Sequence, residues 1–201
     1  PAAERGIPIW IKNTFNPEHP GTRIGPDTSS NGSVVKAITA IPGVSVITVE
    51  GSGFLSVADV TARVFETVGR TGVNVYMVFQ ASSQHSLGFV VRRADASKVL
   101  RALEREFELD LLKGRVARIW EEPGMAIVAV VGAGMRGTPG VAGRVFGTLG
   151  QHRINIVAIA QGSSELNISF VIREDEVARA VPAIHDAFGL GGSAGERSAG
   201  S

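Results

Sequence analysis

Residues 51–80 begin with Gly-Ser-Gly-Phe-Leu-Ser-Val-Ala-Asp and end with Gly-Val-Asn-Val-Tyr-Met-Val-Phe-Gln. Residues 132–161 follow the same plan, starting with Gly-Ala-Gly-Met-Arg-Gly-Thr-Pro-Gly and ending with Arg-Ile-Asn-Ile-Val-Ala-Ile-Ala-Gln. An offset of 81 positions, the separation of Gly51 and Gly132, aligns residues 46–92 with residues 127–173 without a gap. About a third of the aligned pairs are identical, so the chain contains two copies of one structural unit.

The composition fits two small folded domains. The chain has 201 residues, of which 44% are hydrophobic and 25 are glycine, values typical of a compact α/β protein rather than a disordered one. Each copy is about 70 to 80 residues long, and a hydrophobic core of that size is marginal by itself. We therefore expect the two copies to pack against each other.

Charge and residue types exclude several classes of function. The net charge is +1 and the basic residues are scattered among acidic ones, which argues against a nucleic-acid partner. Cysteine is absent and the four histidines have no metal-ligand spacing, so we expect neither disulfides nor a metal site. No apolar run reaches the length of a membrane span and no signal pattern opens the chain, so we expect a cytoplasmic protein with no membrane partner.

Residues 1–32 differ from the rest of the chain. A short extended run at residues 7–11 is followed by a stretch rich in turn formers at residues 16–21. Trp10 and Phe15 argue against a disordered leader, because such leaders seldom carry large apolar side chains. We expect this segment to be the tail of a domain whose body lies upstream.

Hydrophobic periodicity predicts the element order βαββαβ for each copy, and hence an α+β fold with antiparallel sheets and helices on one face. In the first copy it predicts strands at 34–39, 44–49, 73–79, 87–91 and 116–120, and helices at 57–68 and 96–107. In the second it predicts strands at 125–131, 154–160 and 167–172, and helices at 139–149 and 174–188. Pro182 should kink or delay the last helix.

The domain boundaries follow from these elements. Residues 121–124 are predicted to form a short turn between the first unit at 33–122 and the second at 123–190, and residues 191–201 a flexible tail. The second unit is one strand short. Because an open sheet edge can accept a strand from elsewhere, we expect the spare strand at 34–39 to cross over and complete the second unit.

The glycine-rich turn before the first helix of each copy suits a carboxylate ligand. Backbone N–H groups at a helix N-terminus attract an anion, and glycine lets a small ligand approach closely. The neighbouring strand carries amide side chains, which can bind an ammonium or a hydroxyl group. The pattern therefore predicts a site for a free amino acid. The candidate ligand-binding residues are Gly53, Phe54, Leu55, Ser56, Asp59, Asn74 and Gln80 in the first copy, and Gly134, Met135, Thr138, Asn155 and Gln161 in the second.

Structural alternatives exist for most of these residues. Asn74 and Asn155 are as well explained by capping or turning the chain, and Asp59 is most simply a first-turn helix acid. The paired serines at 82–83 and 163–164 suit plain turns. The copies differ where Asp59 is replaced by Gly140 and where Gln84 is replaced by Glu165, so the two sites should differ most there.

Two chemical alternatives are weaker. Residues 132–137 match the G-x-G-x-x-G dinucleotide pattern, but Gln161 stands where a ribose-binding acid belongs and Ser56 replaces the third glycine in the first copy. Arg63 and Arg144 lie on the helix away from the turn, so we expect them to be solvated or paired rather than ligating. No catalytic constellation is present in the sequence.

Three stretches of the chain resemble the C-terminal regulatory region of aspartokinases. Residues 7–24 (Ile-Pro-Ile-Trp-Ile-Lys-Asn-Thr-Phe-Asn-Pro-Glu-His-Pro-Gly-Thr-Arg-Ile) resemble the segment that leads out of the kinase domain. Residues 130–135 (Val-Val-Gly-Ala-Gly-Met) and 159–170 (Ile-Ala-Gln-Gly-Ser-Ser-Glu-Leu-Asn-Ile-Ser-Phe) resemble the second of two tandem ACT domains. The resemblance covers nearly the whole chain and implies ferredoxin-like domains.

The resemblance also implies a function in feedback control. The family phosphorylates L-aspartate with ATP, and its ACT domains bind end-product amino acids. The sequence around Gln80 and Gln161 is most similar to that of threonine-sensitive aspartokinases fused to homoserine dehydrogenase. In those enzymes a glutamine of each ACT domain contacts threonine. Two alternatives to threonine binding stay open: the module binds lysine, or it serves only in assembly and binds no ligand.

The kinase core is absent from the chain, so we expect no catalysis and no cofactor here, with ATP and Mg²⁺ needed only by the absent kinase domain. The expected partners are that kinase domain and a second copy in a homodimer through the ACT domains.

Overall fold

The computed structural model describes residues 2, 5–24, 34–53, 56–80, 86–162 and 164–190. The chain divides into two compact units, residues 1–33 and residues 34–201. In the first, β1 (Ile9–Ile11) pairs antiparallel with β2 (Thr22–Ile24). Trp10 and Phe15 of this unit are 53% and 97% exposed, so its large apolar side chains are not buried within it.

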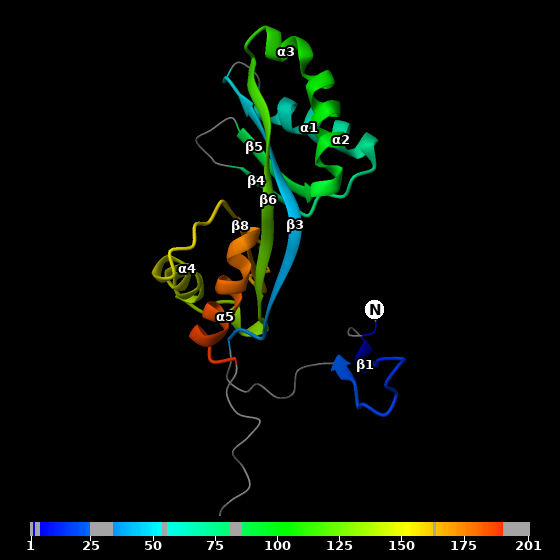
Figure 1. Cartoon of the computed structure of the whole chain (residues 1–201), viewed down its shortest axis with the longest axis vertical. Helices are drawn as coiled ribbons and strands as arrows, with labels where there is room; N and C mark the ends of the chain where they lie inside the picture. Colours follow the sequence, from blue (N-terminus) through cyan, green and yellow to red (C-terminus); the bar gives the residue numbers. More distant parts are fainter. Residues whose placement is uncertain are drawn as a thin grey trace, which may run out of the picture. The chain divides into compact units, whose positions relative to one another are not determined.

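The second unit is built on one antiparallel sheet of six strands in the order β4-β5-β3-β6-β8-β7 (Figure 1). The strands are β3 (Ala37–Gly51), β4 (Met77–Gln80), β5 (Ser86–Arg92), β6 (Val116–Val131), β7 (Ala158–Gln161) and β8 (Asn167–Arg173). The helices are α1 (Val57–Thr71), α2 (Arg93–Glu106), α3 (Glu108–Leu112), α4 (Val141–Gln151) and α5 (Val177–Ala187), with 3₁₀ turns η2 (Ala133–Met135) and η3 (Glu174–Glu176).

The two longest strands, β3 and β6, serve both repeats. The first half of β3 pairs with β6 from Ala37↔Val131 to Ile41↔Ile127, inside the second repeat. Its second half pairs with β5 in the first repeat, from Val44↔Arg92 to Glu50↔Ser86. The predicted crossover strand is therefore confirmed, although it starts at Ala37 and continues into the next strand without a break. Each repeat thereby has four strands and two packed helices, as in a ferredoxin-like fold.

The predicted turn at residues 121–124 is wrong, because β6 runs through it. Pro123-Gly124 in β6 and Pro42-Gly43 in β3 instead form two neighbouring β-bulges, each adding one residue to its strand. Gly43 has φ 71° and Gly124 has φ 72°, a left-handed backbone that glycine adopts without strain. Proline is tolerated at both bulges because the extra residue of a bulge is unpaired, so the missing N–H of proline costs no ladder hydrogen bond.

Both faces of the sheet are buried. On the helix side, α1 and α2 cover a first-repeat core around Phe89 and Leu103, and α4 and α5 cover a second-repeat core around Phe170 and Leu149. The other face curls around a third cluster drawn from both repeats, and this brings the edge strands β4 and β7 into contact. The members of this cluster are Val44, Val46, Met77, Val90, Met125, Ile127, Ala158 and Val171.

Several element ends differ from the prediction. Strands β4 and β7 begin four residues later than predicted. In the first repeat the earlier valines at 73 and 75 pack against the helix-side core from the connection after α1. Helix α4 begins at Val141 because Gly140, with φ 85°, closes the preceding turn. Helix α5 contains Pro182 and starts only at Val177, after η3. The predicted domain boundaries stay a prediction, and the predicted tail lies outside the described residues.

Candidate functional site

The turn that enters α1 has the predicted local structure. Strand β3 ends at Gly51, and Gly53 adopts φ 87°, which favours glycine. Ser56 is the N-cap of α1, where its Oγ accepts a hydrogen bond of 3.2 Å from the backbone N–H of Asp59. Asp59 lies in the first helical turn and is exposed, so its carboxylate is available to a ligand.

Strand register places Gln80 at the same end of the sheet as this turn. Gln80 pairs with Leu87, and Leu87 pairs with Val49, two residues before the end of β3. Adjacent strands lie about 4.8 Å apart, so Gln80 and Val49 are separated by about 10 Å across the sheet. Leu87 and Val49 face the helix-side core, and directly paired residues share a face. The exposed amide of Gln80 therefore lies on the side of the sheet where α1 begins.

Asn74 does not join this group. It lies in the connection between α1 and β4, ahead of Met77, which pairs with Val90 next to Val46. That is the far end of β4 from Gln80, and Asn155 occupies the same place before β7. The structure thus brings Gln80, and not Asn74, to the glycine turn. Phe54 and Leu55 lie outside the described residues.

The second repeat has the same register with a different turn. Gln161 pairs with Ile168, which pairs with Val130, so Gln161 lies beside the start of residues 132–137. Here the carboxylate of Glu165 accepts a hydrogen bond of 2.8 Å from the backbone N–H of Gly137. Glu165 has φ 56°, an uncommon backbone conformation for a residue with a side chain. The second turn was predicted to bind the carboxylate of a ligand. One of its backbone N–H donors is instead occupied by the carboxylate of Glu165.

Three further residues of the second turn have structural partners. Met135 is only 4% exposed and packs into the second-repeat core. The hydroxyl of Thr138 donates to the carbonyl of Gly134 at 2.7 Å instead of capping α4. A Cβ at Gly132 would lie 2.2 Å from the carbonyl oxygen of Val34, so glycine is required where the chain enters β3. The second turn is therefore held together by its own side chains.

Arg63 and Arg144 are paired in the structure, as expected. Arg63 donates to Glu106 at 2.9 Å and to Asp110 at 2.8 Å, and its guanidinium stacks on Phe107 at 4.3 Å. Arg144 stacks in the same way on Phe188 at 4.9 Å. Burial lowers the pKa of Arg63, but the hydrogen bonds with Asp110 and Glu106 outweigh burial, so the pKa is raised and the charge is kept.

The first-repeat site is open. Gly53, Ser56, Asp59 and Gln80 are all exposed, and β4 is an edge strand with one side unpaired within the sheet. Within the described part of the chain, no group of three or more metal-ligating side chains lies together. No helix among those residues has the length and apolar character needed to cross a membrane.

Comparison with known proteins identifies the family. The model of the ACT domain matches the chain twice, at residues 47–107 and 128–188. The chain belongs to the ACT domain family. It is 38% identical to the bifunctional aspartokinase/homoserine dehydrogenase of Daucus carota over 94% of its length, and 36% identical to that of Haemophilus influenzae over 98%. It spans only 21% and 26% of the length of these two relatives.

Solved structures agree with this assignment of the tandem ACT repeats. Aspartate kinase from Clostridium acetobutylicum superposes with a TM-score of 0.77 at 28% identity, covering 93% of the present chain and 43% of that protein. The regulatory subunit of aspartate kinase from Thermus thermophilus has a TM-score of 0.64 at 25% identity, covering 77% and 99%. The tandem ACT fold of this chain is therefore that of an aspartokinase regulatory region.

Proposed function

We propose that the chain is the allosteric module of an aspartate kinase and that it binds threonine in its first ACT repeat. The observation that supports this most is the register that aligns Gln80 with the end of β3 beside the capped start of α1. The enzyme so controlled would transfer phosphate from ATP to L-aspartate, giving 4-phospho-L-aspartate, in a kinase domain outside the chain. The module itself carries out no chemistry.

Each group of threonine has a complement at the first-repeat site. The ligand carboxylate would meet backbone N–H groups of the glycine turn at the positive end of the α1 dipole. The ammonium would meet the exposed carboxylate of Asp59, and the hydroxyl would meet the amide of Gln80, which donates and accepts. Lysine would need a second acid for its side-chain ammonium. The neutral Gln80 therefore favours threonine.

The second repeat is the weaker candidate. Glu165 already accepts from Gly137, so an incoming carboxylate would have to displace a like charge. Gly140 also replaces Asp59, which removes the partner for an ammonium group. We therefore place the effector in the first repeat, although Gln161 repeats Gln80.

A second copy of the chain is the proposed cover for the open site. Val78 on β4 and Ile159 on β7 are 44% and 48% exposed, and both lie on edge strands, which pair readily with another chain. A homodimer through these edges would bury them. The exposed apolar residues of β1 and its surroundings are proposed to contact the kinase domain upstream.

Calorimetry of the purified chain with threonine, lysine and methionine tests the proposal. We expect heat from threonine, and an effect on the kinase only to the extent that threonine prefers one of two arrangements. Gln80→Ala should weaken binding strongly, whereas the matched variant Gln161→Ala should leave the isotherm nearly unchanged. No heat from any of the three in a folded sample would contradict ligand binding. Sedimentation then tests the assembly-only alternative, because that alternative predicts a dimer indifferent to threonine.

A further inference from the structure

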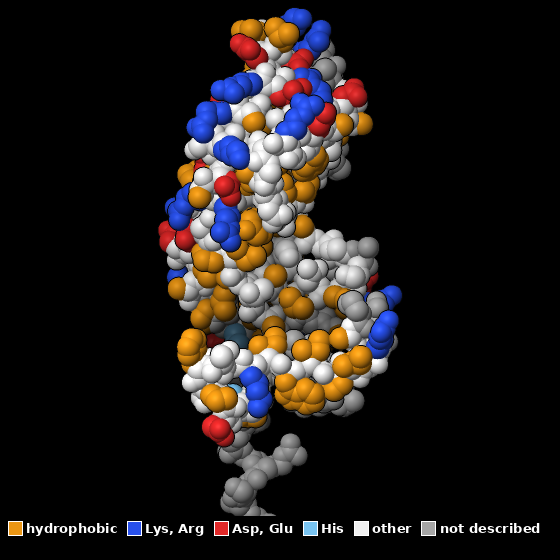
Figure 2. Space-filling model, turned by 90° about the vertical axis from the view of Figure 1, so that its right-hand side faces the viewer, with side chains coloured by type: hydrophobic (Ala, Val, Ile, Leu, Met, Phe, Trp, Pro, Cys, Tyr) orange, Lys and Arg blue, Asp and Glu red, His pale blue; other side chains and the backbone are white. Residues whose placement is uncertain are grey.

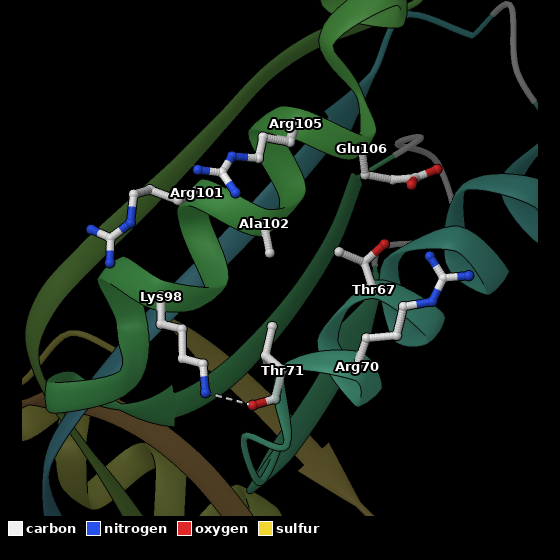
Figure 3. Close-up of a pocket in the computed structure, with 8 residues that line it drawn as sticks. All are labelled: Thr67, Arg70, Thr71, Lys98, Arg101, Ala102, Arg105 and Glu106. Atoms are coloured by element: carbon white, nitrogen blue, oxygen red, sulfur yellow. Dashed lines mark hydrogen bonds between the residues drawn. The ribbon is translucent and has the colours of Figure 1, made fainter.

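A groove of about 610 Å³ lies between α1 and α2, away from the glycine turn (Figure 3). Its floor consists of the small side chains of Thr67, Thr71 and Ala102. Arg70 extends from α1 on one side, and Arg101 and Arg105 extend from α2 on the other (Figure 3). Glu106 also lines the groove, where its carboxylate is ion-paired with Arg63. The groove therefore has a neutral floor and a rim with an excess of positive charge.

Two of the rim arginines are not neutralised by the protein. Arg101 and Arg105 make no ion pair or hydrogen bond with any part of the chain that the structure describes. Both stand on one face of α2 with Lys98, at spacings of three and four residues, where like charges repel. Arg70 pairs with Glu66, but that pair is exposed on both sides and therefore weak.

The second repeat shows which of these residues the fold requires. At the offset of 81 positions, Thr67 corresponds to Thr148 and Ala102 to Ala183, so two of the three floor residues are kept, whereas Thr71 is replaced by His152. Lys98 donates to the carbonyl of Thr71 at 2.7 Å, and its counterpart Arg179 donates to the carbonyl of the corresponding residue, His152. The two shared floor positions and this one cation are therefore explained by the packing of the helices.

The three arginines behave differently. The second repeat has Gln151, Pro182 and Asp186 in place of Arg70, Arg101 and Arg105, and still packs its helices on the same sheet. Folding therefore does not need the positive rim. Figure 2 shows many Lys and Arg side chains, interspersed with Asp and Glu, on the part of the surface formed by the first-repeat helices. A charge that the fold does not require, and that weakens its own helix, points to a ligand.

We propose that this groove binds a small anion carrying several phosphate groups. The planar guanidinium group hydrogen-bonds phosphate through two donors at once, which favours arginine over lysine in such sites. Positive charge on both sides calls for a ligand with several negative charges, because a single anionic group would meet only one side. The volume lies within the range of small-molecule sites.

Titration of the full chain with inorganic tripolyphosphate in phosphate-free buffer tests the site. We expect binding that weakens as salt is added, because exposed charges are screened. ATP and adenosine form the comparison arms. Tighter binding of ATP identifies a nucleotide ligand, and equal binding identifies the polyphosphate group alone. Binding of adenosine as tight as that of ATP overturns the proposal.

Variants separate this site from general charge attraction. Arg101→Gln/Arg105→Gln should weaken tripolyphosphate binding at least about tenfold, the effect of losing one charge-assisted hydrogen bond. Arg105→Asp introduces the residue that the second repeat has at this position, Asp186. It should also weaken tripolyphosphate binding and leave the fold intact. The control Arg173→Gln, which removes one positive charge at a 60% exposed side chain in the second repeat, should bind like the original chain. Thermal unfolding checks that all variants are folded.

Besides the adenosine result, three results would overturn the inference. They are unchanged binding by the α2 double variant, equal weakening by Arg173→Gln, and tighter binding of a polyglutamate peptide than of tripolyphosphate. The last would identify the groove as a docking surface for an acidic protein segment. The threonine isotherm should be unaffected by the α2 variants, so this inference and the proposed effector site can fail independently.

Discussion

The contact between Phe79 and Gly88 should couple strongly in a double-mutant cycle. Phe79 on β4 pairs with Gly88 on β5, and a Cβ at Gly88 would lie 2.2 Å from the Phe79 ring. The second repeat has Ala160 opposite Ser169 at the same two positions. A large residue facing glycine in one repeat thus corresponds to two small residues in the other.

The magnitudes follow from packing. Gly88→Ser alone forces the ring to move and should cost about 1–3 kcal/mol of unfolding free energy, as overpacking does. Phe79→Ala alone should cost about 2 kcal/mol, roughly half the value for a fully buried ring, because Phe79 is half-buried. In the double variant the serine no longer meets a ring. The double variant should therefore lose about 2 kcal/mol of unfolding free energy in total. The sum of the two single losses exceeds this by about 1–3 kcal/mol, which is the coupling free energy.

Urea unfolding followed by circular dichroism measures the four corners of the cycle. Leu112→Ala, at a 78% exposed side chain on α3, is the control and should change stability by less than about 0.5 kcal/mol. Costs that add to within about 0.5 kcal/mol would refute the packing argument. Threonine titrations of the same variants report whether displacement of Phe79 also moves Gln80, its neighbour in β4.

Three further sets of variants test other points of the structure. Glu165→Ala should free the N–H of Gly137 and allow a second, weaker threonine binding event in calorimetry, weaker because Gly140 supplies no partner for the ammonium group; the absence of any second event would contradict a blocking role for Glu165. Gly43→Ala and Gly124→Ala should each cost about 1–2 kcal/mol in urea unfolding, because alanine resists the left-handed backbone of the bulges, and an unchanged midpoint would contradict this. Arg63→Ala should cost about 1–3 kcal/mol in thermal unfolding, since it leaves the buried carboxylate of Asp110 with only the 3.8 Å contact to Arg115, whereas exposed Arg70→Ala should cost far less.

The repeat made much of the fold predictable. An ungapped offset requires the two copies to share one register, and the pairs Gln80↔Leu87 and Gln161↔Ile168 have that relation. The missing last strand of the second copy implied a borrowed one, and β3 supplies it. Local periodicity was sufficient here because each helix and strand buries one clear face.

The bulges and the second turn could not be read from local sequence. A Pro-Gly pair suits a turn as well as a bulge, and at Gly124 the choice depends on pairing with β3 residues some 80 positions earlier. The change from Gln84 to Glu165 marked a difference between the copies, but its partner Gly137 lies 28 residues away. Asn74 does not reach the site of Gln80 because the two residues stand six positions apart at opposite ends of one segment, a separation of about 20 Å if the whole segment is extended.

The shared strands give the proposed effector site a physical route to the second repeat. The glycine turn follows directly from the end of β3 at Gly51, and the beginning of the same strand is hydrogen-bonded to β6 between Val131 and Ile127. A ligand that shifts the Gly51 end therefore acts on a strand that belongs to both repeats. Along that strand the regular pairing with β6 is interrupted at Gly43, and again at the bulge of Gly124 on the other side of the pair Val44↔Met125. If the two bulges serve as a hinge between the halves of the sheet, alanine at Gly43 or Gly124 should weaken the response to threonine as well as stability.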